Sequence, residues 1–185
     1  MSAITPPSPA SQAPPIPPPV RVAVVGAGYW GITHVRTFAR LPGCELHLVC
    51  DAEPKNLKRA KGLAPAARQT TDYASVLADS SIDAVVLAPP AVLHAEQAIA
   101  ALRAGKHVFV EKPLALSVAD AQAVKSAADA SGRVLMVGHL MLYHAAVLRL
   151  REMIQSGDIG EVYYLYALRV NLDGAFFTFR AAARH

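Results

Sequence analysis

The chain has 185 residues, a formal net charge of +4 and 17% charged side chains, and its length suits about one ordinary globular domain. Aromatic residues make up only 6% of the sequence and basic residues are scattered, which argues against a nucleic-acid-binding surface. The abundance of Ala, Val and Leu excludes wholesale disorder.

Residues 1–19 differ in composition from the rest of the chain. They hold eight of the fourteen prolines and no charged side chain, which predicts an extended, disordered proline-rich tail. They lack the features of a secretory signal, and no apolar run of the chain reaches the ~18 residues that a membrane span needs. Cys44 and Cys50 have no metal-like spacing, so free thiols in a reducing, cytoplasmic compartment are expected.

From residue 20 onward, apolar strand-like runs alternate with helix-like segments. Strands are expected at 21–25, 45–50, 84–88, 107–110 and 134–137. Helices are expected at 29–40, around 55–61, from Asp72 to Leu77, from Ala95 to Gly105 and from Ser117 to Gly132. Asp72 is expected to cap its helix, and Ser117 with Asp120 resembles a capping box.

This alternation predicts an α/β fold over residues 20–140, in the form of a doubly wound parallel sheet with helices on both faces. Ligands of such sheets bind outside the carboxyl ends of the strands. The segments directly after each strand are therefore the places where site residues are expected.

The pattern changes near residue 140. Residues 145–156 have the spacing of an amphipathic helix, and residues 161–170 alternate like a long strand. A strand of that kind needs pairing partners, and residues 171–185 supply at most one. We therefore expect 141–185 to be the start of a second domain that stops short.

A glycine-rich motif follows the first expected strand and opens the first expected helix. It matches G-x-G-x-x-G and reads Gly26-Ala27-Gly28-Tyr29-Trp30-Gly31. In a dinucleotide-binding fingerprint, Gly26 permits the tight turn, Gly28 lets the backbone approach a pyrophosphate, and Gly31 allows close packing of the helix. The helix N-terminus then offers unpaired N–H donors to the phosphates.

Asp51 ends the second expected strand, twenty residues after Gly31. That is the position of the acid that accepts hydrogen bonds from the adenosine ribose. A carboxylate there repels a 2′-phosphate, which favours NAD over NADP. Lys55 and Arg59 lie close enough in sequence to soften that preference, so NADP stays open.

A second candidate constellation, Glu111-Lys112-Pro113, follows the strand expected at 107–110. A lysine there can face the nicotinamide cleft and bind a substrate hydroxyl during proton removal. A solvated Lys112 paired with Glu111 is an equally good interpretation of the spacing alone. No grouping of His, Cys or carboxylates predicts a metal site or a nucleophilic triad.

Three motifs together resemble the Gfo/Idh/MocA oxidoreductases. They are the glycine motif at 26–31, Ala88-Pro89-Pro90 with His94, and the block over residues 104–114, which reads AGKHVFVEKPL. The resemblance extends over about residues 20–172.

The resemblance implies a Rossmann domain followed by an α+β substrate domain, with a nicotinamide cofactor and a sugar, nucleotide-sugar or cyclitol substrate. It implies that Lys112 contacts substrate and nicotinamide. It places Ala88, Pro89 and His94 in the loop that lines the cofactor cleft. The full set of expected cofactor-binding residues is Gly26, Gly28, Tyr29, Trp30, Gly31, Asp51, Ala88, Pro89, His94, Glu111 and Lys112. Full-length members are expected to form homo-oligomers.

One departure from the family pattern bears on catalysis. Members carry an Asp and a His four residues apart in the second domain, whereas here Asp173 has Phe177 at the matching position. Residues 173–185 do not resemble the family. The leading hypothesis is therefore an NAD(P)-dependent oxidoreductase impaired by truncation. A non-catalytic dinucleotide-binding module and an S-adenosylmethionine-dependent methyltransferase are the alternatives.

Overall fold

The computed structural model describes residues 18–162, which fall into two units on either side of residue 137. Most of the expected proline-rich tail, the expected strand after its first two residues, and the segment with Asp173 and Phe177 lie outside the described residues. The two units are described separately below, and the expected domain boundary near residue 140 stays a prediction.

The first unit is built on a six-stranded sheet in which every described strand pair is parallel. The strands are β1 (Val20–Val25), β2 (Cys44–Cys50), β3 (Arg68–Thr70), β4 (Ala84–Leu87), β5 (His107–Val110) and β6 (Leu135–Val137). Their order in the sheet is β3-β2-β1-β4-β5-β6. The order reverses between β1 and β4, so this is where a doubly wound sheet opens a crevice for a ligand.

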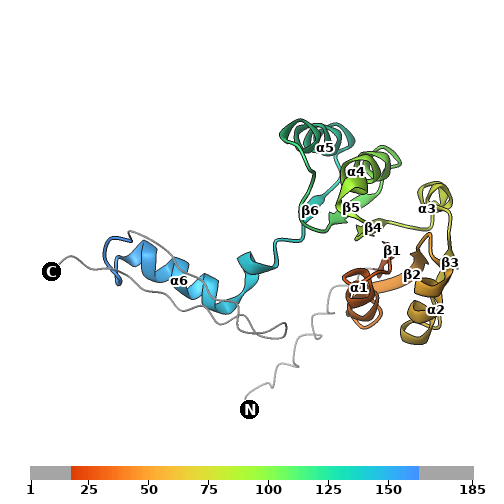
Figure 1. Cartoon of the computed structure of the whole chain (residues 1–185), viewed down its shortest axis with the longest axis horizontal. Helices are drawn as coiled ribbons and strands as arrows, with labels where there is room; N and C mark the ends of the chain where they lie inside the picture. Colours follow the sequence, from red (N-terminus) through yellow and green to blue (C-terminus); the bar gives the residue numbers. More distant parts are fainter. Residues whose placement is uncertain (1–17, 163–185) are drawn as a thin grey trace, which may run out of the picture. The chain divides into compact units, whose positions relative to one another are not determined.

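Five α-helices accompany the sheet in the described part of this unit. They are α1 (Gly31–Phe38), α2 (Pro54–Leu63), α3 (Tyr73–Ala78), α4 (His94–Arg103) and α5 (Val118–Ser131), with a short 3₁₀ turn η1 (Ala91–Leu93) before α4. Figure 1 shows α4 and α5 on one side of the sheet and α1 and α2 on the other. The doubly wound α/β fold expected from the sequence is confirmed.

Two apolar cores lie on the two faces of the sheet. Val22 and Val24 of β1 pack in the core that includes Ile32 and Val35 of α1. Ala23 and Val25 belong to the opposite core, which includes residues of α3, α4 and α5. The alternation follows from strand geometry, because successive side chains point to opposite faces.

Local signals set several helix ends as expected. The Asp72 carboxylate accepts hydrogen bonds from the N–H groups of Ala74 and Ser75, at 2.9 and 3.2 Å. The Ser117 hydroxyl accepts one from Asp120 at 3.0 Å. Gly105 and Gly132 follow their helices with φ of 76° and 63°, in the left-handed region that glycine adopts without strain.

Two elements differ from the expectation. The first helix begins at Gly31 rather than near residue 29, because the glycine turn occupies the preceding residues. The strand β3 was missing from the expected set. It is a three-residue edge strand with the sequence Arg-Gln-Thr, so it carries no apolar alternation that would predict it.

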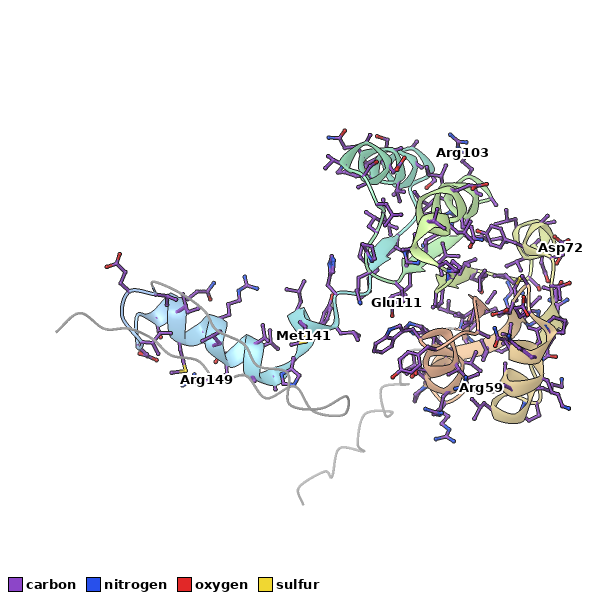
Figure 2. The ribbon with its side chains drawn as sticks, in the orientation of Figure 1. Arg59, Asp72, Arg103, Glu111, Met141 and Arg149 are labelled. Atoms are coloured by element: carbon purple, nitrogen blue, oxygen red, sulfur yellow. The ribbon has the colours of Figure 1, made fainter. Side chains whose placement is uncertain are left out.

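The described part of the second unit contains a 3₁₀ turn, η2 (Leu140–Tyr143), and the helix α6 (Ala145–Ser156). Figure 2 labels Met141 in the first and Arg149 in the second. The Nδ1 atom of His144 accepts a hydrogen bond from the Ala146 N–H at 3.2 Å, and Gly157 ends the helix with φ of 78°. The helix expected over 145–156 is confirmed.

Candidate dinucleotide site

The glycine-rich turn leaves the carboxyl end of β1 through a tight backbone approach. Gly26 has a φ of 83°, and its N–H donates to the Cys50 carbonyl at 2.8 Å. A Cβ at Gly26 would lie 2.6 Å from the Ala88 carbonyl carbon and from the Pro89 nitrogen. Both the backbone angle and the close approach therefore require glycine at this position.

The other two motif glycines have different surroundings. A Cβ at Gly31 would lie 1.6 Å from the Gly26 carbonyl oxygen, so the start of α1 packs directly on the turn. A Cβ at Gly28 would meet no atom within 4 Å. The space in front of Gly28 is thus open, which fits the expected approach of a phosphate group to the backbone.

The N-terminus of α1 carries no negative charge that would repel an anion. Its cap residue, Trp30, makes no side-chain capping bond, and the first turn contains no acidic residue. The Ile32 and Thr33 N–H groups donate to the carbonyls of Gly28 and Trp30 at 3.1 and 2.9 Å, so the positive end of the helix dipole and the backbone of the preceding glycine turn are what a phosphate would meet. Tyr29 and Trp30 are 70% and 42% exposed, and their rings meet edge to face with centroids 5.6 Å apart.

Asp51 ties the end of β2 to the glycine turn. Its Oδ2 accepts from the Ala27 N–H at 2.6 Å, and its Oδ1 accepts from the Glu53 N–H at 2.8 Å and from the Asn56 amide at 3.1 Å. The residue is 8% exposed. A carboxylate has about four lone-pair positions, so the three bonds leave capacity for a ribose hydroxyl.

The loop after β4 borders the same turn. The Ala88 N–H donates to the Val25 carbonyl at 2.8 Å, which holds the loop beside β1. His94 begins α4 and is 2% exposed. Its ring nitrogens lie 3.0 Å from the Pro89 carbonyl oxygen and 2.6 Å from that of Pro113. His94 therefore contacts both the loop after β4 and the loop after β5.

The Lys112 loop leaves the carboxyl end of β5, at the same edge of the sheet as the glycine turn. Glu111, labelled in Figure 2, is 5% exposed, whereas Lys112 is exposed. The Lys112–Pro113 peptide bond is cis. One Glu111 oxygen accepts from the Lys112 backbone N–H at 3.2 Å, and the other lies 2.7 Å from Nε2 of His34. The pairing of Glu111 is thus with His34 and the Lys112 backbone.

Sequence reasoning missed two residues that the structure brings to the site. His34 was not among the expected site residues, although it lies only three residues after Gly31. Asn56, which bonds Asp51, carried no signal of its own. His107 begins β5 and so lies at the amino edge of the sheet, away from the glycine turn.

Lys106 has a purely structural environment. It is 5% exposed, and its ammonium donates to the carbonyls of Asp79 and Ile82 at 2.6 and 2.9 Å. These bonds tie the start of β5 to the loop before β4, away from the glycine turn. Of the two lysines in the block over residues 104–114, only Lys112 lies at the carboxyl edge.

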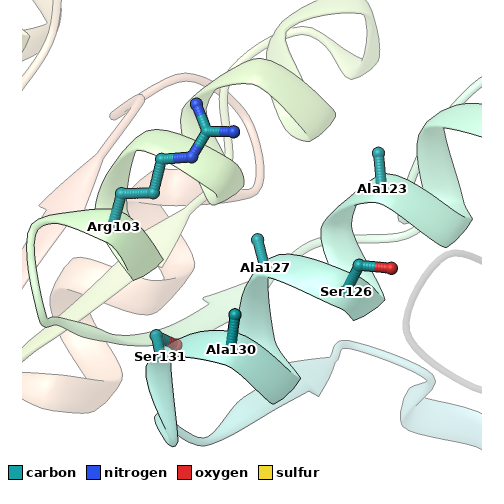
Figure 3. Close-up of a pocket in the computed structure, with 6 residues that line it drawn as sticks. All are labelled: Arg103, Ala123, Ser126, Ala127, Ala130 and Ser131. Atoms are coloured by element: carbon teal, nitrogen blue, oxygen red, sulfur yellow. The ribbon is translucent and has the colours of Figure 1, made fainter.

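Other features of the described chain lie away from the glycine turn. A hollow of about 530 Å³ is lined by Arg103 of α4 and by small residues of α5. Figure 3 draws these side chains. Among residues 18–162, no group of three His, Cys or acidic residues could hold a metal ion. In that same range no helix combines the length and apolarity needed to cross a bilayer.

A parallel sheet with a glycine turn at its switch point, an uncapped helix N-terminus and an acid ending β2 defines a Rossmann-type dinucleotide-binding domain. Residues 20–139 match the family model of Gfo/Idh/MocA proteins, described as an oxidoreductase family with an NAD-binding Rossmann fold. The chain belongs to the Gfo/Idh/MocA oxidoreductase family, which confirms the resemblance and the expected NAD-binding Rossmann fold.

Individual relatives agree with this assignment. The chain is 36% identical over 140 residues to a 4-carboxy-2-hydroxymuconate-6-semialdehyde dehydrogenase from Sphingobium sp., covering 76% of this chain and 44% of the relative. It is similar to the structure of myo-inositol 2-dehydrogenase from Lactobacillus plantarum, with a TM-score of 0.73, 27% identity and coverage of 78% and 43%.

A second similar structure is a mutant 3-ketoreductase from Actinomadura kijaniata in complex with TDP-benzene and NADP. It has a TM-score of 0.72 and 30% identity, with coverage of 78% of this chain and 46% of that one. The chain therefore spans less than half the length of the relatives that it matches.

Proposed function

We propose that this chain binds NAD across the β1–β4 switch point and forms the cofactor-binding part of an NAD(P)-dependent oxidoreductase. The proposed substrate is a sugar, nucleotide sugar or cyclitol whose hydroxyl or carbonyl exchanges hydride with the nicotinamide. The observation that carries the proposal is the bond from the Ala27 N–H to Asp51 at 2.6 Å. It holds the phosphate-binding turn and the ribose-binding acid in one arrangement.

The residues present fit a dinucleotide along its length. The α1 N-terminus and the open space at Gly28 suit the pyrophosphate, with Gly26 and Gly31 shaping the turn. Asp51 suits the adenosine ribose, and the exposed Tyr29 and Trp30 flank the entrance to α1. When bound, the nicotinamide supplies hydride transfer.

The loops after β4 and β5 provide the remaining proposed contacts. Ala88 and Pro89 border the glycine turn, and Lys112 is the proposed catalytic residue. Its ammonium would donate a hydrogen bond to the substrate oxygen and stabilise the negative charge that develops on that oxygen during hydride transfer. Glu111 and His94 are placed beneath these loops, so we assign them to the site as supports for the cofactor-binding edge.

The preference for NAD rests on Asp51. Its carboxylate would lie against a 2′-phosphate, and two like charges at close range repel strongly in a partly buried position. The nearby Lys55 is 79% exposed and pairs weakly with Glu53 at 3.8 Å, so it can rotate toward a phosphate. NADP binding is therefore expected to be weaker than NAD binding but measurable.

The proposed ligands and location are consistent with the candidate dinucleotide site. We propose a small sugar-like substrate, no nucleic acid or membrane partner, and a cytoplasmic location, in keeping with the free thiols of Cys44 and Cys50. For residues 1–185 we expect cofactor binding with little or no turnover, because Asp173 has Phe177 where the family pattern has His.

Calorimetric titration of the 185-residue chain with NAD, NADP and S-adenosylmethionine tests the proposal. We expect binding in the order NAD, then NADP, with no heat from S-adenosylmethionine. Tight binding of S-adenosylmethionine alone would replace the oxidoreductase by a methyltransferase. A parallel assay for NADH formation from a panel of cyclitols and sugars tests turnover, and rapid NADH production would contradict the expected impairment.

A further inference from the structure

Lys112 lies between two residues that each contact a histidine, one half-buried and one buried. Glu111, which precedes it, has its carboxylate 2.7 Å from Nε2 of His34. Pro113, which follows it, has its carbonyl oxygen 2.6 Å from Nδ1 of His94. The two histidines come from different helices, α1 and α4.

The contact between His34 and Glu111 is shielded from water. The two side chains are 13% and 7% exposed, and the His34 ring packs edge to face on Phe109, with centroids 5.3 Å apart. A buried carboxylate without a donor is costly, so His34 is the partner that keeps Glu111 turned inward. The second Glu111 oxygen accepts from the Lys112 N–H at 3.2 Å, which carries this orientation to the Lys112 backbone.

His94 holds the other side of the turn. Its second ring nitrogen lies 3.0 Å from the Pro89 carbonyl oxygen, so the same ring links Pro113 to the loop after β4. The side chain is 2% exposed and cannot change its rotamer without breaking both contacts. Lys112 itself is exposed, so neighbouring residues rather than its own packing set its backbone position.

We propose that His34 and His94 are positioning residues that hold the Lys112 turn from its two sides, and so set the direction in which the lysine side chain leaves the backbone. The catalytic meaning of this inference rests on the proposed function. Its structural content does not, because the contacts exist without cofactor. The arrangement links the lysine to the helix of the glycine turn and to the helix after the β4 loop.

Amide exchange measured by NMR on the cofactor-free 185-residue chain tests this directly. In His34→Leu and His94→Leu, we expect exchange of the Lys112 amide to become about tenfold faster, as fits the loss of one hydrogen-bonded support. His34→Gln and His94→Gln keep an N–H donor and should restore exchange to near the original rate. His47→Leu is the matched control, since His47 also makes two side-chain contacts, to Glu45 and Ser81, at 2.9 Å each.

Should a leucine variant fail to fold, His34→Asn replaces it. This substitution keeps a polar amide but shortens the side chain, so its donor falls short of Glu111 while His34→Gln reaches it. Unchanged Lys112 exchange in folded His34→Leu and His94→Leu, or an equal change in His47→Leu, would overturn the proposal.

A binding experiment separates this inference from the proposed function. NADH and ADP-ribose share the part that binds the glycine turn, but only NADH carries the nicotinamide. We expect His34→Leu and His94→Leu to weaken NADH binding several-fold while ADP-ribose affinity stays constant. An equal loss for both ligands would assign the histidines to the glycine turn and overturn the positioning role. Absence of NADH binding in the unsubstituted chain would count against the proposed function alone.

Discussion

Asp51 accepts a hydrogen bond of 2.6 Å from the backbone N–H of Ala27, so the acid that ends β2 is bonded directly to the glycine-rich turn after β1. The acid is therefore part of the architecture of the turn as well as a candidate ribose ligand. Substituting it should affect stability and cofactor binding together, and the two effects can be measured separately.

Asp51→Ala removes the acceptor for three donors, two of them backbone N–H groups. We expect the free energy of unfolding to fall by about 1–3 kcal/mol and NAD affinity to fall with it. Urea unfolding and calorimetry measure the two quantities. Glu53→Ala is the control, because its 62% exposed side chain should change stability by less than about 0.5 kcal/mol. Equal stability of both variants would contradict the structural role.

The motif glycines should separate folding from binding. Gly31→Ala places a methyl group 1.6 Å from the Gly26 carbonyl oxygen, so we expect a destabilisation of at least about 3 kcal/mol in thermal or urea unfolding. Gly28→Ala meets no atom within 4 Å and should fold normally. Its methyl group occupies the space expected for the pyrophosphate, so NAD affinity should fall about tenfold or more. Retained affinity in that variant would show that the phosphates lie elsewhere.

Substitutions of the two lysines in the block over residues 104–114 should have different effects on the free energy of unfolding. Lys106→Met leaves the carbonyls of Asp79 and Ile82 without their donor, so we expect a loss of about 1–3 kcal/mol of stability with unchanged NAD affinity. Lys112→Met alters an exposed side chain and should leave unfolding within about 0.5 kcal/mol of the original. A larger loss of stability in Lys112→Met than in Lys106→Met, measured by urea unfolding, would contradict the roles assigned to the two residues.

The two cysteines should differ in thiol reactivity. Burial, with the nearby charges of Asp51 and Asp72, raises the pKa of the Cys50 thiol to about 11. The reactive species is the thiolate, so iodoacetamide at pH 8 should leave Cys50 unlabelled in the folded chain. Cys44 is half-buried and should be labelled first, although burial and Glu45 also raise its pKa. Peptide mass spectrometry before and after unfolding in urea measures the order, and early labelling at Cys50 would contradict its burial.

Acid should weaken the amino edge of the sheet. Arg21 holds the pKa of Asp83 below its ordinary value, mainly through a side-chain hydrogen bond, in a pair 3.0 Å apart whose side chains are both 39% exposed. A depressed pKa in the folded state stabilises the protein above the unfolded value of about 4, and this contribution is lost as the pH falls through the folded value. At pH values below about 4, unfolding should therefore need less urea, and the urea midpoint should decrease less in Asp83→Asn than in the unsubstituted chain. An identical acid response in both proteins would exclude a contribution from this pair.

Features encoded by neighbouring residues could be predicted from the sequence. The strand β1, the glycine turn and the caps at Asp72 and Ser117 each depend on a few adjacent residues, and the structure confirms these elements and caps. The strand β3 and the place of His34 in the candidate site could not be predicted, for two different reasons. The strand β3 is short and polar, and its place depends on pairing with β2.

The contact of His34 with Glu111 joins residues 77 positions apart. This contact forms only when α1 packs against the sheet, so no pattern of neighbouring residues predicts it. For the same reason, the sequence alone does not show how the exposures of Lys106 and Lys112 differ, although both belong to the block over residues 104–114. Their opposite exposures arise because one precedes β5 and the other follows it.

The division of β1 between two cores has a consequence for ligand binding. Val22 and Val24 fill one side and Ala23 and Val25 the other, and Gly26 follows at once. A shift of this strand by one residue would move every side chain to the opposite face and would bring a valine to the site of Ala23. The packing of the two cores therefore fixes the residue at which β1 ends, and with it the position of the glycine-rich turn.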